Sequence, residues 1–547
     1  MTLRHFLVLL CCLVGLFSSP AFSADSTTSH SLSDNQAPPA LAPLMLKLTQ
    51  EKYSKLLPVL KEIEANSNET TASLFRIMMQ GDLYFIKTNK QLVQHFKDNG
   101  KDLYQGIFSQ KVIADVTKRS VTKIKVNNRL RGYLRTAIAR IQLTSASAEI
   151  RLSAVQELLS NLDDDTVAMI EALYSSETNK DVKAEMGLAL AINTALSTEL
   201  PNSTRIAAIH RLSSSLENTV RNKLTQLTNQ DNPAIKTAAQ QALSSISQRT
   251  ERFAFLNQLF FGLSLGSVLL LASIGLAITF GVMGVINMAH GEMIMLGAYT
   301  TYVVQLMMPN YIDYSIWVAI PAAFIVSGLV GVLIERLVIR HLHGRPLETL
   351  LATFGISLIL QQLVRTIFSP LNRQVASPSW MSGSWEINPV LSLTLNRLYI
   401  LAFSLLVFMA LVMVLKKTSL GLNVRAVSQN RNMAKAMGVK TDWIDAITFA
   451  LGSGIAGIAG VALSQLTNVG PNLGQDYIIN SFMVVVFGGV GNLLGTLVAA
   501  FSLGIATKFL EPMTGAVLST ILVLVFIILF IQKRPKGLFP QKGRAAE

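Results

Sequence analysis

The sequence has very little cysteine and no motif that carries covalent chemistry. Its two cysteines, Cys11 and Cys12, lie at the N-terminus, in a segment that we expect to be removed. A mature chain without thiols forms neither disulfides nor thiolate metal sites. The sequence also contains no metal-ligand spacing, no nucleophile motif and no G-x-x-x-x-G-K-[ST] loop for nucleotide phosphates. These absences predict no catalytic residue, no metal site and no cofactor in this chain, and therefore a protein that is not an enzyme.

Charged residues are also scarce, at 15% of the 547 residues, although the formal net charge is +14. A positive balance can indicate nucleic acid, but aromatic and basic residues are not interleaved here as a nucleic-acid surface requires. In the second half of the chain the basic residues instead gather in loops between apolar segments, as they do on the cytoplasmic side of membrane proteins. The sequence therefore predicts a membrane as partner and no nucleic acid.

Long apolar runs fill the second half of the chain, and the mean hydropathy is +0.42. Runs of 18 or more apolar residues indicate membrane helices. We therefore predict an all-α protein with a polytopic transmembrane helix bundle at 255–533 and a cytoplasmic tail at 534–547. About nine spans are expected, at 257–281, 291–309, 315–338, 349–369, 397–415, 446–466, 477–490, 493–510 and 515–532.

A leader and a tether are expected before the soluble region. Residues 1–23 have a basic start at Arg4, an apolar core and a small-x-small site at Ala21-Phe22-Ser23. These features are typical of a secretory signal peptide, and an uncleaved anchor is the alternative. Residues 24–43 are rich in Ser, Thr, Ala and Pro, which predicts a flexible tether.

Residues 44–250 show helical periodicity and an internal repeat. The segment 151–159 (RLSAVQELL) aligns with 205–213 (RIAAIHRLS), and 182–190 aligns with 235–243, at an offset of about 53 residues. Apolar residues at i, i+3, i+4 and i+7 are typical of helices that pack on one face. Paired helices repeated in this way resemble HEAT-type repeats, which stack into binding surfaces. We therefore expect a soluble, helical, HEAT-like repeat domain.

Three groups of basic residues predict the orientation in the membrane. They follow the third span, follow the fifth span and end the chain, so that all three fall on one side. That side is expected to be the cytoplasm. An odd number of spans then leaves 44–250 in the periplasm, and a signal peptide requires the same orientation. The groups are Arg336, Arg340 and Arg345; Lys416, Lys417, Arg425, Arg431, Lys435 and Lys440; and Lys533, Arg534, Lys536, Lys542 and Arg544.

Polar residues interrupt the apolar pattern between the first two spans. Asn287, His290 and Glu292 lie close to or within depths where polar side chains are costly. Glycines on both sides allow the helix to break. A broken, polar-lined hydrophobic segment indicates a transport pathway. The alternative is a short cytoplasmic turn in which His290 and Glu292 are solvated.

Two further segments are candidates for the same pathway. Thr353, Ser357 and Gln361 recur every four residues in the fourth span and form one polar stripe, which is either a pore wall or a source of interhelical hydrogen bonds. A group of glycines interrupts the seventh and eighth spans, either as a broken helix that lines the path or as a site of close helix packing. The glycines are Gly488, Gly489 and Gly491.

Several of these motifs resemble the permeases of the branched-chain amino acid ABC importers. The resemblance covers essentially all of 255–540, but this chain adds a leader and about 230 soluble residues, as does the first permease subunit of the urea ABC importers, a branch of the same family. The motifs that carry it are Gly266-Ser267, Gly275-Leu276, Phe280-Gly281, GVINMAHGE at 284–292, LGAY at 296–299, Leu420-Gly421, Arg425-Ala426, Ala434, Ala436, MGV at 437–439 and GGVGN at 488–492.

The basic loop 416–445 is the candidate for contact with an energy-supplying partner. Residues 424–437 show helical periodicity, and Gly438 follows where a C-cap glycine is expected. The expected apolar stripe consists of Val424, Val427, Met433 and Met437. The resemblance places on about 425–440 the coupling helix that inserts into an ATPase subunit. A solvated loop is the alternative. The candidate coupling residues are Arg425, Ala434, Met437 and Gly438.

The resemblance, taken with these features, implies the membrane-spanning permease subunit of an ATP-driven importer in a bacterial inner membrane, which translocates urea or a small amide. The resemblance implies a second permease subunit, two ABC ATPase subunits and a periplasmic solute-binding protein. A branched-chain amino acid permease is the alternative substrate class. An ATP-independent channel or secondary transporter is disfavoured because no charged pair near the bilayer midplane suits ion coupling. A sensor is disfavoured because the spans exceed what an anchor needs and no cytoplasmic output domain exists.

Overall fold

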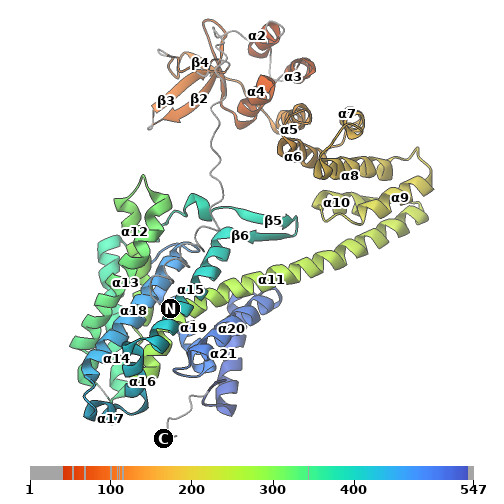
Figure 1. The fold of residues 1–547 in the computed structure, drawn as a ribbon. Coiled ribbons are helices and arrows are strands. Elements are labelled where there is room, and N and C mark those ends of the chain that lie inside the picture. Colours follow the sequence, from red (N-terminus) through yellow and green to blue (C-terminus); the bar gives the residue numbers. More distant parts are fainter. Residues whose placement is uncertain are drawn as a thin grey trace. The chain divides into compact units, whose positions relative to one another are not determined.

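The computed structural model describes residues 41–539, apart from 52–54, 67–68, 99–100, 108, 110, 114–115 and 343. The expected signal peptide at 1–23, most of the tether at 24–43, both cysteines and the tail residues 540–547 lie outside the described residues. Two compact units are present (Figure 1). The N-terminal unit comprises Met1–Leu212 and Gln230–Ile235, and the membrane unit comprises Ser213–Asn229 and Lys236–Glu547.

The N-terminal unit contains a β-sheet that the sequence did not reveal. Helices α2 (Ala42–Gln50), α3 (Leu56–Ala65), α4 (Glu69–Gln80) and α5 (Asn128–Gln142) share one apolar core. Between α4 and α5 lies an antiparallel sheet in the order β3-β2-β1-β4, formed by β1 (Leu83–Ile86), β2 (Leu92–Asp98), β3 (Lys101–Gly106) and β4 (Val121–Lys123). The all-α prediction is wrong here, because strands of three to seven residues are too short for period-two alternation to stand out.

The helices after α5 begin at intervals that match the sequence repeat. They are α6 (Ala148–Leu158), α7 (Asp164–Tyr174), α8 (Lys180–Leu196), α9 (Asn202–Leu212), α10 (Asn218–Leu227) and α11 (Pro233–Met283). Helices α9, α10 and α11 each begin about 53 residues after α6, α7 and α8 respectively. The repeat is therefore a group of three helices and not a pair, and the HEAT-like assignment is not confirmed. Helix α11 also continues through residues 250–255, where the sequence placed the domain boundary.

Equivalent positions of the two repeat copies make equivalent side-chain contacts. In the first copy, Arg151 donates two hydrogen bonds to the carboxylate of Glu177, at 2.8 and 2.9 Å. In the second copy, Arg205 donates to the amide oxygen of Gln230 at 2.8 Å. Equivalent arginines therefore anchor both copies, through an ion pair with Glu177 in the first copy and through the neutral side chain of Gln230 in the second.

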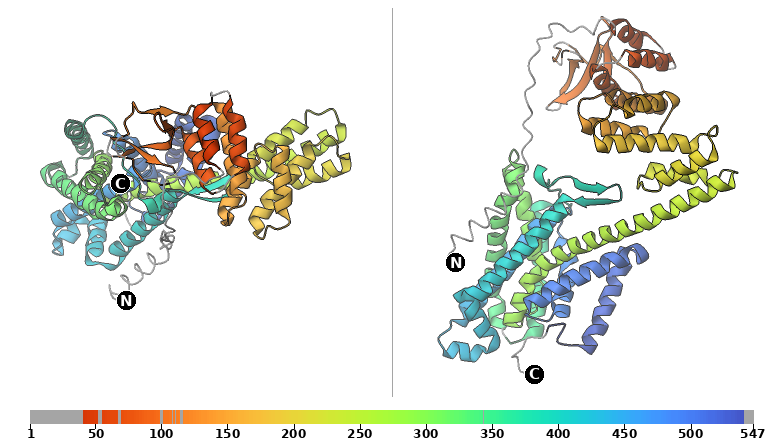
Figure 2. Two further views of the ribbon diagram at one scale, coloured as in Figure 1. Left: turned by 90° about the horizontal axis from the view of Figure 1, so that it is seen from above. Right: turned by 45° about the vertical axis from the view of Figure 1, so that its right-hand side comes forward.

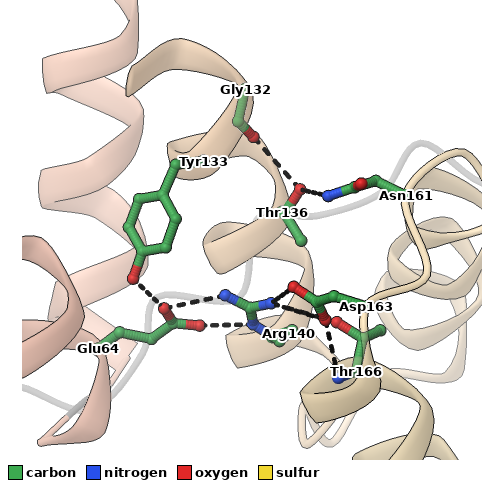
Figure 3. Close-up of polar contacts among 8 residues, drawn as sticks. All are labelled: Glu64, Gly132, Tyr133, Thr136, Arg140, Asn161, Asp163 and Thr166. Atoms are coloured by element: carbon green, nitrogen blue, oxygen red, sulfur yellow. Dashed lines mark hydrogen bonds and ion pairs between the residues drawn. The ribbon is translucent and has the colours of Figure 1, made fainter. Parts of the chain in front are cut away.

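A second arginine joins three helices of the N-terminal unit (Figure 3). The guanidinium of Arg140 on α5 donates to both oxygens of Glu64 on α3, at 2.7 and 3.1 Å. It also donates to Asp163 at 2.9 Å and to the hydroxyl of Thr166 at 3.2 Å. Tyr133 donates to the same Glu64 carboxylate. Arg140 is buried, and its positive charge is balanced by two carboxylates, so this network ties α3, α5 and α7 together.

The membrane unit is a helix bundle with a small hairpin at one end of α15 and two short helices at the other end (Figures 1 and 2). After α11 come α12 (His290–Met307), α13 (Ile312–Leu337), η2 (Ile339–Leu342), α14 (Pro346–Phe368), η3 (Ser379–Met381), β5 (Ser384–Asn388), β6 (Leu391–Thr394), α15 (Leu395–Lys417), α16 (Ser419–Gln429), α17 (Arg431–Ala436), α18 (Thr441–Ser464), α19 (Leu473–Gly488), α20 (Leu493–Thr514) and α21 (Ala516–Lys533).

Helices α11 and α18 form the centre of this bundle. The most apolar window of α11 is 83% buried and that of α18 is 78% buried, whereas the other long apolar helices are 17–33% buried. Small residues let the central helices approach closely. A Cβ at Gly275 of α11 would meet the carbonyl oxygen of Gly452 of α18, and a Cβ at Gly297 of α12 would meet that of Gly457. The exposed apolar faces of the outer helices are those expected of helices in lipid.

Seven helices of the described residues are long and apolar enough to cross a membrane: α11, α13, α14, α15, α18, α20 and α21. The predicted count of nine is therefore not confirmed. The other two expected spans coincide with α12, which does not meet this criterion, and with α19, which has only 16 residues.

Candidate functional site

The chain breaks between α11 and α12 and turns back into the bundle. Gly284 has a φ of +68°, a conformation that glycine adopts without strain, and residues 284–289 are not helical. The Nε2 of His290 donates to the carbonyl of Ala272 at 2.9 Å. Ala272 lies about three helical turns before the end of α11 at Met283. Helix α12 therefore begins alongside α11, well before the end of that helix.

The position of Gly452 supports the same depth for this helix start. A Cβ at Gly275 would meet both Gly452 and the ring of His290. Gly452 is in the middle of α18, which runs over Thr441–Ser464. The N-terminus of α12 thus lies about half way through the bundle. This location explains why α12 is not a full-length membrane span.

Helix α14 presents the predicted polar stripe to this broken segment. The hydroxyl of Thr353 accepts a hydrogen bond from the backbone N–H of Met288 at 3.1 Å. Ser357 and Gln361 donate to the same carboxylate oxygen, Oε1 of Glu292, at 2.9 and 2.8 Å. The structure therefore brings together residues that are some 65 positions apart in the chain. We call Asn287, His290, Glu292, Thr353, Ser357 and Gln361 the central polar cluster.

The central polar cluster keeps polar atoms without a partner. Asn287, His290 and Glu292 are each at most 1% exposed, so the alternative of a solvated turn is wrong. Within the described part of the chain, Nδ2 of Asn287, Nδ1 of His290 and Oε2 of Glu292 make no hydrogen bond. Because His290 donates through Nε2, its Nδ1 is an acceptor when the ring is neutral. The cluster thus offers one free donor and two free acceptors in the interior of the bundle.

A second helix begins at the same depth. A Cβ at Gly474 would meet the carbonyl of Gly291, and a Cβ at Gly291 would meet the carbonyl of Gly474. The backbones of α12 and α19 therefore touch within the first turns of both helices. The chain before α19, residues 465–472, is not helical. Discontinuous helices whose N-termini meet in the interior are typical of binding sites in transporters.

The three candidate glycines Gly488, Gly489 and Gly491 do not join the central polar cluster. They form the turn between α19 and α20, in which Gly489 and Gly491 have φ values of +102° and +79°. The turn instead binds the C-terminal segment: Leu538 and Phe539 donate their backbone N–H groups to the carbonyls of Phe487 and Gly488, at 2.9 and 3.2 Å. This geometry favours the close-packing interpretation of these glycines.

The candidate coupling loop forms two helices where the sequence predicted one. Asn430 ends α16 and caps α17, because its side-chain oxygen accepts from the N–H of Met433 at 2.9 Å. Gly438 follows α17 with a φ of +86°, which confirms the predicted C-cap glycine. Val424, Val427 and Ala434 are buried against the end of α18.

The exposed part of this loop differs from the predicted stripe. Met433 and Met437 were expected to share an apolar face with the valines, but they are 60% and 78% exposed. Arg425 is exposed, but its guanidinium donates to the carbonyl of Leu415 at the end of α15 and so ties α16 to α15. Of the four candidates, Arg425, Met437 and Gly438 are exposed and Ala434 is buried, and Arg425 also binds the end of α15.

Basic residues from the first two predicted groups lie at one end of the bundle. Arg340, after α13, contacts Asp442 at 3.3 Å, and Arg336 lies over the ring of Trp443, with its guanidinium 5.1 Å from the ring centroid. Arg431 pairs with Asp445. The same end holds the last residues of α11 and α15, which pack against α16.

The sequence did not predict a cavity that is lined by charged side chains. It has a volume of about 550 Å³ and lies among α11, α19, α20 and α21. Asp476, Asn480, Lys508 and Glu511 line it. A signal was present, since these polar residues stand within or next to the expected spans 477–490 and 493–510, where charges are rare.

Comparison with known proteins identifies the family. The protein family described as "Branched-chain amino acid transport system / permease component" matches residues 258–531. The chain belongs to this family. The matched range contains all of the central polar cluster, both discontinuous helices and the charged cavity.

Proteins similar to this chain are named for different solutes. The "High-affinity branched-chain amino acid transport system permease protein LivH" of Salmonella typhimurium is 32% identical over 299 residues, which cover 52% of this chain and 95% of the relative. The corresponding protein BraD of Pseudomonas aeruginosa is 29% identical and is covered to 96%. The "Ribose import permease protein RbsC" of Escherichia coli is 25% identical and is covered to 80%. No solved structure matches.

Proposed function

We propose that this chain is the membrane-spanning permease subunit of an ATP-driven importer in a bacterial inner membrane and that it translocates urea or a small amide. In this proposal the chain works with a second permease subunit, two ABC ATPase subunits and a periplasmic solute-binding protein. It performs no covalent chemistry. Its helices offer a path for the solute, and the partner ATPases supply the energy.

The central polar cluster is the observation that carries this proposal. An unpaired polar atom is costly inside a membrane protein and is retained where it serves a function. Urea has a carbonyl oxygen that accepts hydrogen bonds and four N–H groups that donate them. The free Nδ2 of Asn287 matches the carbonyl, and the free acceptors on His290 and Glu292 match the N–H groups. Donor and acceptor types therefore agree between the cluster and a small amide.

The layout of the chain also favours the urea branch. The family match begins at residue 258, and the residues before it form a folded unit with its own core. The first permease subunit of the urea importers carries an added soluble region of this kind. The proposal places this region in the periplasm, before the first span.

A branched-chain amino acid permease is the second candidate, because the relatives LivH and BraD are named for that activity. A specific feature also supports it. The cavity lined by Asp476, Lys508 and Glu511 has both acidic and basic groups, which suit the ammonium and carboxylate of an amino acid. The two candidates share a fold and partners and differ only in the solute.

Uptake into proteoliposomes tests the proposed solute. The assembled complex, supplied with ATP, is given labelled urea, with unlabelled leucine as competitor. We expect urea uptake that leucine does not suppress. Asn287→Ala should slow urea uptake about tenfold, since it removes one hydrogen bond to the solute from a dry site. Asn310→Ala, an exposed asparagine between α12 and α13, is the matched control. Leucine uptake that urea does not compete with would assign the protein to the amino acid branch.

A second experiment tests dependence on an ATPase. The exposed Met437 and the left-handed Gly438 form the accessible end of α17. Gly438→Trp has space for its side chain but strains the backbone, because nothing lies within 4 Å of an added Cβ while φ stays at +86°. We expect normal insertion of this variant and loss of ATPase stimulation by the binding protein. Normal stimulation would remove this loop from the mechanism.

The orientation is tested with alkaline phosphatase fusions, which are active only outside the cytoplasm. We expect an active fusion after Ser247 and an inactive one after Leu415, at the end of α15 where basic residues gather. The opposite pair of results would reverse the proposed topology and place the N-terminal unit in the cytoplasm.

A further inference from the structure

The cavity among α11, α19, α20 and α21 lies outside the central polar cluster. Its volume of about 550 Å³ falls in the range of small-molecule sites. Part of its lining is apolar and includes Leu265 and Leu269 of α11 and Val523 of α21. Helices α19 and α20 contribute both apolar and polar side chains. The cavity lies among membrane helices, but its lining includes charged side chains, which lipid tails do not suit.

Asp476 places a carboxylate in the lining of this cavity. It stands in the first turn of α19, and within the described residues its carboxylate has no ion-pair partner. Asn480, one turn further on, donates its side-chain amide to the backbone carbonyl of Asp476 at 3.3 Å and not to the carboxylate. The carboxylate is therefore free to accept hydrogen bonds from a molecule in the cavity.

Lys508, which pairs with Glu511, supplies a hydrogen-bond donor to the same cavity. The two residues are three positions apart on α20 and form an ion pair in which the Nζ–Oε2 distance is 2.6 Å. An ammonium has three hydrogens, so Lys508 has donors left after it binds Glu511. Since these two charges cancel, Asp476 leaves the cavity with one unbalanced negative charge. A neutral solute rich in N–H groups, or one with an ammonium, satisfies this charge.

The start of α19 lies between the cavity and the central polar cluster. Leu473 and Asp476 line the cavity, and Gly474 between them touches the backbone of Gly291, the neighbour of Glu292. The cavity and the cluster thus lie on either side of one helix turn. A solute held at Asp476 is therefore next to the depth at which α12 begins.

We propose that this cavity is a solute-binding site separate from the central polar cluster, in which Asp476 accepts hydrogen bonds from the N–H groups of a small polar solute and Lys508 donates to its carbonyl or carboxylate oxygen. This inference rests on the proposed transport function. Urea and an amino acid share this chemistry, and the experiment distinguishes them. In this proposal the cavity and the central polar cluster are two successive binding sites on one solute pathway.

Cysteine protection tests the site without measuring transport. Cys11 and Cys12 are the only cysteines of the sequence, so their replacement by serine gives a background free of thiols. Asn480→Cys is then introduced, and the assembled complex in nanodiscs is labelled with N-ethylmaleimide at increasing concentrations of urea or leucine. We expect the solute of the site to slow labelling at least fivefold. Ser384→Cys on the exposed strand β5 is the control, and its labelling should not respond to either solute.

Asp476→Asn in the Asn480→Cys background tests the role of the carboxylate. We expect the half-protecting solute concentration to rise about tenfold or more, because a hydrogen bond to a charged group contributes that much to affinity. Glu348→Gln is the matched control. It also removes one carboxylate, from an exposed pair with Arg345 three positions away. This variant should keep the original half-protecting concentration.

The outcomes separate this inference from the transport function. Protection by urea supports the site and the small-amide solute, and protection by leucine alone supports the site with an amino acid as solute. No protection by either, in a complex that takes up urea, would overturn the site and leave the transport function intact. Unchanged protection in Asp476→Asn would also overturn it. Labelling without solute, compared between variants, shows whether the helices are still folded.

Discussion

The N-terminal unit and the membrane unit each bury a cluster of polar side chains, but they pair the atoms differently. In the N-terminal unit, Arg140 binds Glu64, Asp163 and Thr166, and its guanidinium is balanced on both sides. In the membrane unit, Glu292 binds Ser357 and Gln361 through one oxygen only. Its other oxygen has no hydrogen bond within the described residues.

This difference separates a structural polar cluster from one that is available to a ligand. A buried charge that is fully paired holds its helices together, and the loss of one partner leaves the others uncompensated. A buried group with a spare donor or acceptor has not reached its lowest energy without a further partner. We therefore expect the Arg140 network to contribute to stability, in line with our proposal that the central polar cluster serves solute passage.

The largest expected effect comes from breaking the paired network. Arg140→Met leaves Glu64 and Asp163 without their shared cation, so the free energy of unfolding of the N-terminal unit should fall by about 3–5 kcal/mol. The measurement is thermolysin resistance of the full-length protein in detergent at increasing denaturant. The control is Arg135→Met on the same helix, whose ion pair with Glu157 is exposed. It should cost less than about 1 kcal/mol. Equal losses would show that the Arg140 network has no special role.

The matching change in the membrane unit should affect transport and not stability. Gln361→Leu removes a hydrogen bond to Glu292 and should slow urea uptake about 10–100-fold, the factor expected for a bond to a charged group. Yield and thermal stability of the complex should stay close to those of the wild type. Gln362→Leu is the control, since this neighbouring glutamine is exposed on α14. A fall in stability as large as that of Arg140→Met would make the central polar cluster structural as well.

Acid should weaken the first repeat copy. The hydrogen bonds from Arg151 lower the pKa of Glu177 to about 2, whereas a glutamate in an unfolded chain titrates near about 4.3. A depressed folded-state pKa contributes stability above the unfolded value, and this contribution is lost as the pH falls from about 4.3 to 2. The same protease-resistance assay is run in acid, with pepsin in place of thermolysin. Wild type should lose more stability over this range than Glu177→Gln, and equal losses would contradict the assignment.

The smallest expected effect comes from giving the second copy the ion pair of the first. Gln230→Glu places a carboxylate opposite the buried Arg205 and should raise the free energy of unfolding by up to about 1 kcal/mol at neutral pH. The gain should disappear in acid, as the pair in the first copy does. The resistance assay at pH 7 and pH 3 measures both. A variant less stable than wild type at pH 7 would show that the neighbouring Asp231 outweighs Arg205.

Much of the central polar cluster could be predicted from the sequence, because its parts are local patterns. The spacing of Thr353, Ser357 and Gln361 places them on one helix face, and glycines flank the polar residues at 287–292. The C-cap at Gly438 was predicted for the same reason. The coupling loop was predicted less well, since Asn430 divides it into two helices by capping the second, and one residue can outweigh a periodic pattern.

Other features could not be predicted because they depend on contacts between distant segments. The sheet of the N-terminal unit pairs short strands, and β1 meets β4 across more than thirty residues. The glycine turn at 488–491 binds residues 538 and 539 near the other end of the sequence. The charged cavity gathers residues from four helices, none of which shows a motif by itself.

The sequence by itself determined the membrane helices, the family, the repeat period and the residues of the polar stripe, since hydropathy and periodicity act along the chain. Only the tertiary structure decided that α12 and α19 begin inside the bundle, that the stripe faces Glu292, and that three polar atoms there stay unpaired. These outcomes depend on where one backbone packs against another. The contact of Gly291 with Gly474 sets that position, and no local pattern encodes it.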